Sequence, residues 1–301
     1  MASWQARLTV LVLKALVKKR PEATTDVARV RATLGRARRR ALRLPAGWTA
    51  RAASVGGVAG EWIEPAAGPA PARAVLYLHG GGYFFMAPQN YRPITGMLAR
   101  LGPARVFAPA YRLAPEHRFP AAVEDALAAY RGLVAAGIAP GRLVVAGDSA
   151  GGGLALALLV ALRDAGDILP AGAVCLSPWT DLAATGASLV ENDRRCALFY
   201  GDAIRRGAGI YLGRSDARHP LASPLYAELK GLPPLLIHAG SDEVLRDDAV
   251  RFAERARAAG VAVTLKLWPV VPHVWQLFGN FLPEGRASFA EIAAFLRERT
   301  A

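Results

Sequence analysis

A serine framed by glycines has the setting in this chain that most clearly suggests chemistry. The segment Gly147-Asp148-Ser149-Ala150-Gly151 reads G-x-S-x-G and lies between an apolar run, residues 143–146, and a helix-like run that begins near Leu154. Side chains at the two glycine positions would collide with the strand and the helix, so a tight turn here requires glycine. The turn pushes the Ser149 hydroxyl over the carboxyl edge of a sheet, beside helix N–H groups that favour negative charge.

A second glycine segment lies upstream of the first by one helix–strand repeat. His79-Gly80-Gly81-Gly82 closes the apolar run of residues 74–78. Backbone without side chains can bring N–H groups close to a substrate oxygen, where they stabilise negative charge. A G-x-S-x-G segment alone is a weak signal. Together, in a strand–turn–helix context, the two segments predict nucleophilic attack on a carbonyl carbon.

Five histidines are candidates for the base that a serine nucleophile needs. In a sheet of this kind the order along the chain is Ser, then Asp or Glu, then His. His273 follows Ser149 and lies in a loop a few residues beyond a predicted strand, residues 263–268, so we predict that it is the base. His79 is expected to pin the glycine loop by hydrogen bonds. His238, inside another predicted strand, is expected to pack in the core.

The acid that orients the base is expected in the loop after the preceding strand, residues 235–239. That loop reads Gly240-Ser241-Asp242-Glu243, so two carboxylates qualify. We favour Asp242, three residues past the strand, and expect Glu243 to cap the next helix or face solvent. Asp148, beside the serine, is predicted to stabilise its turn.

Short apolar runs alternate with helix-like stretches from about residue 58 to the end of the chain. The predicted strands are residues 58–63, 74–79, 105–109, 143–147, 173–176, 235–239 and 263–268. The predicted helices are residues 91–100, 121–136, 152–165, 247–259 and 284–299. This alternation predicts a single large α/β domain with a mostly parallel sheet that is buried on both faces.

Two long stretches do not fit the alternation, namely residues 1–51 and the region from Asp181 to about Tyr226. Both are long enough to be helical additions above the sheet, where they would roof the site. Within the first stretch, one helical face carries Trp4, Leu8, Leu11, Val12, Ala15 and Leu16. We predict an amphipathic helix there that packs on or covers something.

The formal net charge of +13 is concentrated near the N-terminus. Residues 1–51 hold 13 Lys/Arg and 2 Asp/Glu, which is +11, whereas the remaining 250 residues hold 24 and 22, which is +2. The segment could bind anionic lipid or nucleic acid. It has no recognisable nucleic-acid module, and we favour a solvated basic face without a nucleic-acid partner.

The remaining composition is typical of a globular protein. Two cysteines, Cys175 and Cys196, make no disulfide framework and fit a reducing, cytoplasmic compartment. Cys175 lies in an apolar run and is expected to be a buried thiol. The sequence has no run of about 20 apolar residues, so we expect no membrane-spanning helix.

Three motifs together resemble those of a known family. His79-Gly80-Gly81-Gly82, Gly147-Asp148-Ser149-Ala150-Gly151-Gly152 and Tyr111-Arg112-Leu113-Ala114-Pro115-Glu116-His117 look like the hormone-sensitive-lipase branch of the α/β hydrolases, the bacterial family IV esterases. The resemblance covers about residue 58 to the end. It implies an α/β-hydrolase fold with a helical cap, made of residues 1–52 and 181–225, on a catalytic domain of residues 53–180 and 226–301.

The resemblance also implies the site and the reaction. It implies a triad of Ser149, Asp242 and His273, and an oxyanion hole made by the backbone N–H groups of Gly81, Gly82 and Ala150. The implied activity is hydrolysis of short-acyl carboxylic esters through an acyl-enzyme, without metal or other cofactor. Relatives of this kind often dimerise through the last strand and helix, so a homodimer is an expectation too.

The substrate is less well defined by the sequence. Tyr83 and Phe84 are predicted to line the substrate pocket, and Phe85 fits either the pocket or the core. The segment that follows His273, Val274-Trp275-Gln276-Leu277-Phe278, is similar to that of monoterpene ε-lactone hydrolases, which makes lactones or terpenoid esters an alternative substrate class. A small-molecule receptor on the same scaffold is disfavoured because such relatives usually lose the histidine.

Overall fold

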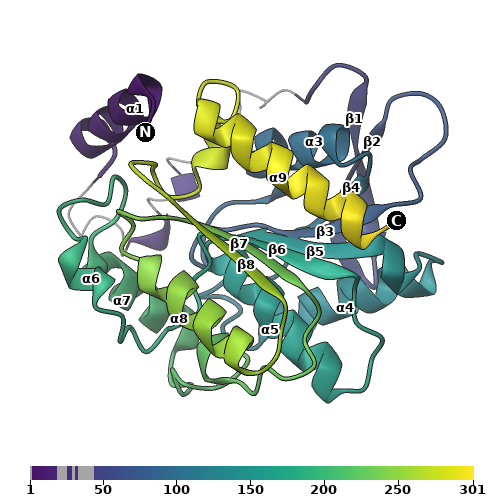
Figure 1. Cartoon of the computed structure of the whole chain (residues 1–301). Helices are drawn as coiled ribbons and strands as arrows, with labels where there is room; N and C mark the ends of the chain where they lie inside the picture. Colours follow the sequence, from purple (N-terminus) through teal and green to yellow (C-terminus); the bar gives the residue numbers. More distant parts are fainter. Residues whose placement is uncertain (1, 19–25, 29–30, 33–43) are drawn as a thin grey trace.

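An eight-stranded sheet is the frame of the molecule in the computed structural model, which describes residues 2–18, 26–28, 31–32 and 44–301 (Figure 1). The strand order is β1-β2-β4-β3-β5-β6-β7-β8. The strands are β1 (Trp48–Val55), β2 (Val58–Pro65), β3 (Ala74–Leu78), β4 (Arg105–Pro109), β5 (Leu143–Asp148), β6 (Gly172–Leu176), β7 (Leu235–Gly240) and β8 (Val263–Trp268). The pairs β1–β2 and β2–β4 are antiparallel, and the pairs from β4 onward are parallel.

Helices connect the strands and cover both faces of the sheet (Figure 1). The α-helices are α1 (Trp4–Leu16), α3 (Arg92–Leu101), α4 (Ala121–Ala135), α5 (Ala150–Asp164), α6 (Ser188–Glu191), α7 (Gly201–Leu212), α8 (Arg246–Ala258) and α9 (Pro283–Arg299). Four short 3₁₀ helices lie in the described connections: η2 (Pro88–Tyr91), η3 (Pro140–Arg142), η4 (Pro224–Tyr226) and η5 (Trp275–Phe278).

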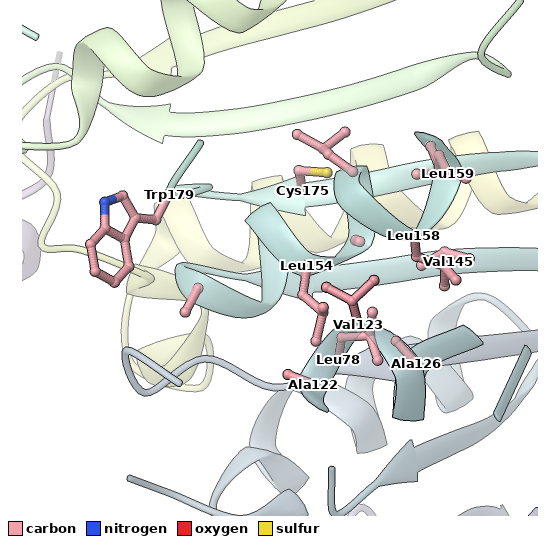
Figure 2. Packing of buried hydrophobic residues seen from close by; sticks show 14 of the residues in the cluster. Leu78, Ala122, Val123, Ala126, Val145, Leu154, Leu158, Leu159, Cys175 and Trp179 are labelled. Carbon is pink, nitrogen blue, oxygen red and sulfur yellow. The ribbon is translucent and has the colours of Figure 1, made fainter. Parts of the chain in front are cut away.

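Alternating side chains of the central strands divide the core into two layers. Leu76 and Leu78 of β3 belong to the layer under α4, α5 and α8, whereas Val75 and Tyr77 belong to the layer under α3 and α9. Figure 2 shows the first layer, where Leu154 of α5 lies near Leu78 and the small side chains of α4. Strands that are covered on both faces need apolar residues at every position, which explains their continuous apolar runs.

The strands and helices predicted from residue 58 onward are confirmed, each to within two residues at its ends. Cys175 is buried with a free thiol, as expected. One boundary is wrong: the helical addition predicted for residues 1–52 ends earlier, because β1 begins at Trp48 and joins the sheet. The sequence does contain a signal for this hairpin, the pair Gly56-Gly57. Their positive φ angles of 59° and 79° permit a two-residue turn between β1 and β2.

The predicted N-terminal helix is confirmed as α1. Its apolar face, which was predicted to pack on or cover something, is mostly exposed among the described residues. Trp4, Leu11 and Leu16 are 66%, 64% and 74% exposed. The side of the helix that packs on the protein carries Ala6 and Leu13 instead. Across the described ranges of the chain, no helix combines the length and the apolar character that a membrane span requires.

Candidate active site

Ser149 lies in a strained turn between β5 and α5. Its backbone has φ 53° and ψ −123°, a conformation that costs a non-glycine residue about 1–3 kcal/mol. The Ser149 N–H donates to the Leu176 carbonyl at 2.8 Å, and the Trp179 N–H donates to the Ser149 carbonyl at 2.9 Å. These two bonds fasten the turn to the end of the neighbouring strand β6, which offsets part of the strain.

Glycine is required on both sides of the serine because backbone comes very close there. A Cβ atom on Gly147 would lie 2.2 Å from the Gly151 carbonyl oxygen. A Cβ atom on Gly151 would lie 2.0 Å from the Leu78 carbonyl oxygen, at the end of β3. The tight turn is therefore pressed against the strand that leads into the second glycine segment, as the sequence predicts.

That second segment forms a loop on the cavity that Ser149 also lines. Gly81 and Gly82 both contribute to the cavity wall. In the described part of the chain, the N–H groups of Gly81 and Gly82 donate no hydrogen bond to a protein acceptor. Ala150 is the first residue of α5, where a helix leaves its N–H groups without an intrahelical partner. The N–H groups of Gly81 and Gly82, on the cavity wall, and that of Ala150, next to Ser149 in the sequence, are thus without a protein acceptor among the described residues.

Asp148 joins the serine turn to the glycine loop. Its carboxylate oxygen Oδ1 accepts from the Tyr77 hydroxyl at 2.6 Å and from the Gly80 N–H at 2.9 Å. Burial raises the pKa of Asp148 to about 6, against the lowering effect of those hydrogen bonds. The carboxylate thus ties the serine turn to β3 and to the glycine loop, whereas its predicted role within the turn itself stays a prediction.

His79 holds the other end of the same loop. Its Nδ1 lies 2.7 Å from the Gly80 carbonyl, and its ring stacks on Tyr111 with centroids 4.3 Å apart. The Tyr111 hydroxyl donates to the His79 carbonyl at 2.6 Å. Because burial lowers the pKa of His79 to about 4, the ring is neutral at pH 7. It pins the loop, as predicted.

His273 lies in the loop between β8 and η5 and lines the same cavity as Ser149. Its Nδ1 is 2.5 Å from Oε2 of Glu243, and both side chains are buried. Its Nε2 is buried too and has no hydrogen-bond partner among the described residues. An imidazole held at Nδ1 by a carboxylate keeps Nε2 available for proton transfer.

The preference for Asp242 as the partner of His273 is wrong in this geometry. Glu243 is 1% exposed and contacts the imidazole, whereas Asp242 is partly exposed and has no hydrogen bond to His273. The expectation that Glu243 caps a helix or faces solvent is wrong for the same reason. Asp242 and Glu243 are adjacent in the loop after β7, so their distance from the strand in the sequence could not show which of them reaches His273.

Two further residues that the sequence analysis missed hold the Glu243 loop. Oε1 of Glu243 accepts from the Ser177 hydroxyl at 2.7 Å and from the Gly240 N–H at 2.5 Å. From the insertion after β6, the Asn192 side-chain amide donates to the carbonyls of Ser241 and Glu243 at 3.0 and 2.9 Å. Neither Ser177 nor Asn192 lies in a segment with a recognisable sequence signal.

The cavity beside Ser149 measures about 180 Å³ and is largely apolar. Its walls are Phe84, Phe85, Met86, Trp179, Leu198, Phe199, Ile204, Leu245 and Leu277. Phe84 and Phe85 both line this cavity, and their role in a substrate pocket stays a prediction. Tyr83 does not: it is buried and stacks on Tyr211 of α7 with ring centroids 3.8 Å apart. The backbone of Tyr83 has a positive φ of 67°, which is unusual for a residue other than glycine.

Parts of the insertion after β6 contribute to this cavity. Leu198 and Phe199 precede α7, and Ile204 and Gly207 belong to it. By contrast, no described residue before β1 lines the cavity. Arg31, which does not line the cavity, nevertheless contacts a residue that does. Its guanidinium donates to the carbonyls of Phe84 and Ala114 at 2.8 and 2.7 Å.

The chain is similar to known hydrolases in sequence and in structure. A family model described as an α/β hydrolase fold matches residues 75–277. An acetyl-hydrolase of Streptomyces hygroscopicus is 51% identical over 247 residues, which cover 82% of each chain. The crystal structure of an esterase from the bacterial hormone-sensitive lipase family is 41% identical, with a TM-score of 0.89 over 100% of both chains. EstE5, soaked by p-nitrophenyl butyrate, is 39% identical, with a TM-score of 0.91 over 99% of both chains.

The chain therefore belongs to the α/β-hydrolase family and, within it, to the esterases that resemble hormone-sensitive lipase. The resemblance stated from the three motifs is confirmed. The protein is a carboxylic ester hydrolase.

Gly151→Ala tests the close approach of the serine turn to β3. The added methyl group meets backbone that cannot move freely, so we expect the free energy of unfolding to fall by about 3 kcal/mol. Gly209→Ala is the matched control, since nothing lies within 4 Å of a Cβ at that helical position. We expect it to raise the stability slightly. Urea unfolding measures the free energy of unfolding of both variants. Equal values for the two would contradict the close approach of Gly151 to β3.

Proposed function

We propose that Ser149, His273 and Glu243 form the catalytic triad of this esterase. The observation that carries the proposal is the buried His273–Glu243 pair at 2.5 Å, on the cavity that Ser149 also lines. His273 Nε2 takes the proton as the Ser149 oxygen attacks the ester carbonyl carbon. Glu243 stabilises the resulting imidazolium and keeps Nδ1 protonated.

The backbone N–H groups of Gly81, Gly82 and Ala150 are the proposed oxyanion hole. Their freedom from protein acceptors supports this role, because a donor that is already engaged cannot stabilise new charge. The imidazolium gives its proton to the ester's alkoxide oxygen as the bond from that oxygen to the carbonyl carbon breaks, so an alcohol departs and the acyl group stays on Ser149. Water, activated by the same imidazole, then hydrolyses this acyl-enzyme.

The proposed substrates are esters with a short acyl group. Support comes from the small apolar cavity and from the acetyl-hydrolase to which the chain is 51% identical. Gly207 is central to the cavity's size, since a Cβ there would lie 3.3 Å from the Phe84 ring and 3.5 Å from the Trp179 ring. Lactones as substrates stay a prediction.

The insertion that supplies Phe199 and Ile204 is the proposed cap, within residues 181–225. It closes over the cavity and orders the Glu243 loop through Asn192. The homodimer through β8 and α9 stays a prediction. The outer edge of β8 offers it a surface, because that strand ends the sheet in the described ranges.

Ser149→Ala tests the proposed nucleophile. We expect kcat for p-nitrophenyl butyrate to fall by at least about 10⁴-fold, because the oxygen that attacks the ester carbonyl carbon is lost. Ser54→Ala, on the exposed edge strand β1, is the control and should keep full activity. Circular dichroism verifies that both variants fold. Activity within tenfold of wild type in folded Ser149→Ala would rule out the proposed chemistry.

Gly207→Val tests the acyl pocket. The side chain would occupy space between Phe84 and Trp179, so the ratio of kcat/KM for p-nitrophenyl butyrate to that for the acetate should fall at least about tenfold. Gly209→Val, on the open side of α7, should leave the ratio unchanged. A ratio does not depend on how much enzyme is folded. If it stays constant in Gly207→Val, the acyl group lies elsewhere.

A further inference from the structure

A row of large apolar side chains on α1 points to solvent. Trp4, Leu8, Leu11, Val12 and Leu16 are each between 44% and 74% exposed, and we call them the α1 face. Phe281, 48% exposed, extends this face onto the loop before α9, with its ring 6.1 Å from that of Trp4. A contiguous apolar surface of this kind marks an interaction site, whereas single exposed apolar residues are ordinary.

The face is held in place by contacts at both ends of α1. At the start, the Ser3 N–H and hydroxyl donate to the Glu284 carboxylate at 2.6 and 2.9 Å. At the end, the Lys18 ammonium donates to the carbonyls of Asp193 and Cys196 and lies 4.0 Å from the Tyr200 ring centroid. With Ala6 and Leu13 packed inward, the helix cannot roll to bury its outward side chains.

Charge on the helix selects the kind of partner. Arg7 and Lys14 follow Trp4 and Leu11 by three residues, which places them beside the apolar row. They pair with no carboxylate in the ranges that the structure describes, and α1 itself contains no acidic residue. The whole stretch of residues 1–51 carries +11. Two copies of such a face would repel each other, whereas an anionic surface would attract it.

The location of α1 relates it to the cavity. Lys18 donates a hydrogen bond to the Cys196 carbonyl, and the chain continues from there into Leu198 and Phe199, which line the cavity. Trp4 touches Phe281, close in sequence to Leu277, which lines another wall. Figure 1 shows α1 at the margin of the molecule, outside the helices that cover the sheet. A surface that binds the α1 face would therefore lie near the walls of the cavity.

We propose that the α1 face docks the enzyme on an anionic phospholipid surface. The apolar side chains enter the boundary between headgroups and acyl chains, and the flanking Arg7 and Lys14 lie among the phosphates. This is peripheral binding in the plane of the membrane, and it does not require a spanning helix. Docked in this way, the enzyme meets apolar esters that have partitioned into the lipid.

Vesicle cosedimentation of the full chain tests the proposal. We expect binding to vesicles of phosphatidylcholine with phosphatidylglycerol, and weaker binding to phosphatidylcholine alone or at high salt. Leu8→Ser with Leu11→Ser should lower the partition coefficient at least about tenfold. Arg7→Gln with Lys14→Gln should lower it on the anionic vesicles and have little effect on phosphatidylcholine.

The control is a pair of apolar residues that are exposed elsewhere. Ile168→Ser with Val190→Ser, 73% and 69% exposed in the wild type, should bind vesicles as the wild type does. Hydrolysis of dissolved p-nitrophenyl butyrate reports folding of each variant, since α1 lines no part of the cavity. The proposal is overturned if the wild type does not bind, or if both serine pairs reduce binding equally. It is also overturned if light scattering shows that the α1 face joins two copies of the chain instead.

Discussion

A buried carboxylate at the carboxyl edge of the sheet is the constraint on which the site depends. Removing the charge of Glu243 from water is costly unless hydrogen bonds replace the lost hydration. Three partners supply them: the Gly240 N–H, the Ser177 hydroxyl and His273 Nδ1. They come from the ends of β7 and β6 and from the loop after β8. The hydrogen bonds to this one carboxylate therefore hold the segments that follow β6, β7 and β8 next to one another.

The other half of the site is built by backbone geometry. The strained Ser149 turn is pressed against the end of β3 at a distance that excludes a side chain on Gly151. The Asp148 carboxylate then accepts from the Gly80 N–H, which links the serine turn to the glycine loop. The parallel sheet brings both halves to the same edge, as expected for an α/β fold. Apolar side chains of the insertion after β6, among them Leu198, Phe199 and Ile204, line the cavity that Ser149 and His273 share.

Much of this could be predicted from the sequence because the signals are local. Apolar runs marked the buried strands, and the glycines around Ser149 marked a turn that only glycine allows. The choice between Asp242 and Glu243 was different, because it depends on which side chain reaches His273 in space. Tyr83 likewise lies in a segment of three aromatic residues, and its stacking on Tyr211 of the insertion is a contact between distant segments that the local pattern does not contain. β1 was not predicted as a strand, because it lies at the edge of the sheet and carries no continuous apolar run.

The most direct test of the account compares the two neighbouring carboxylates. In Glu243→Gln the amide keeps the shape of the side chain, but its NH₂ group opposes Nδ1–H and favours the wrong tautomer of His273. The account predicts that kcat/KM for p-nitrophenyl butyrate falls by about 10³- to 10⁴-fold in Glu243→Gln, while Asp242→Asn stays within about threefold of wild type. The reverse outcome, with Asp242→Asn inactive and Glu243→Gln active, would contradict it.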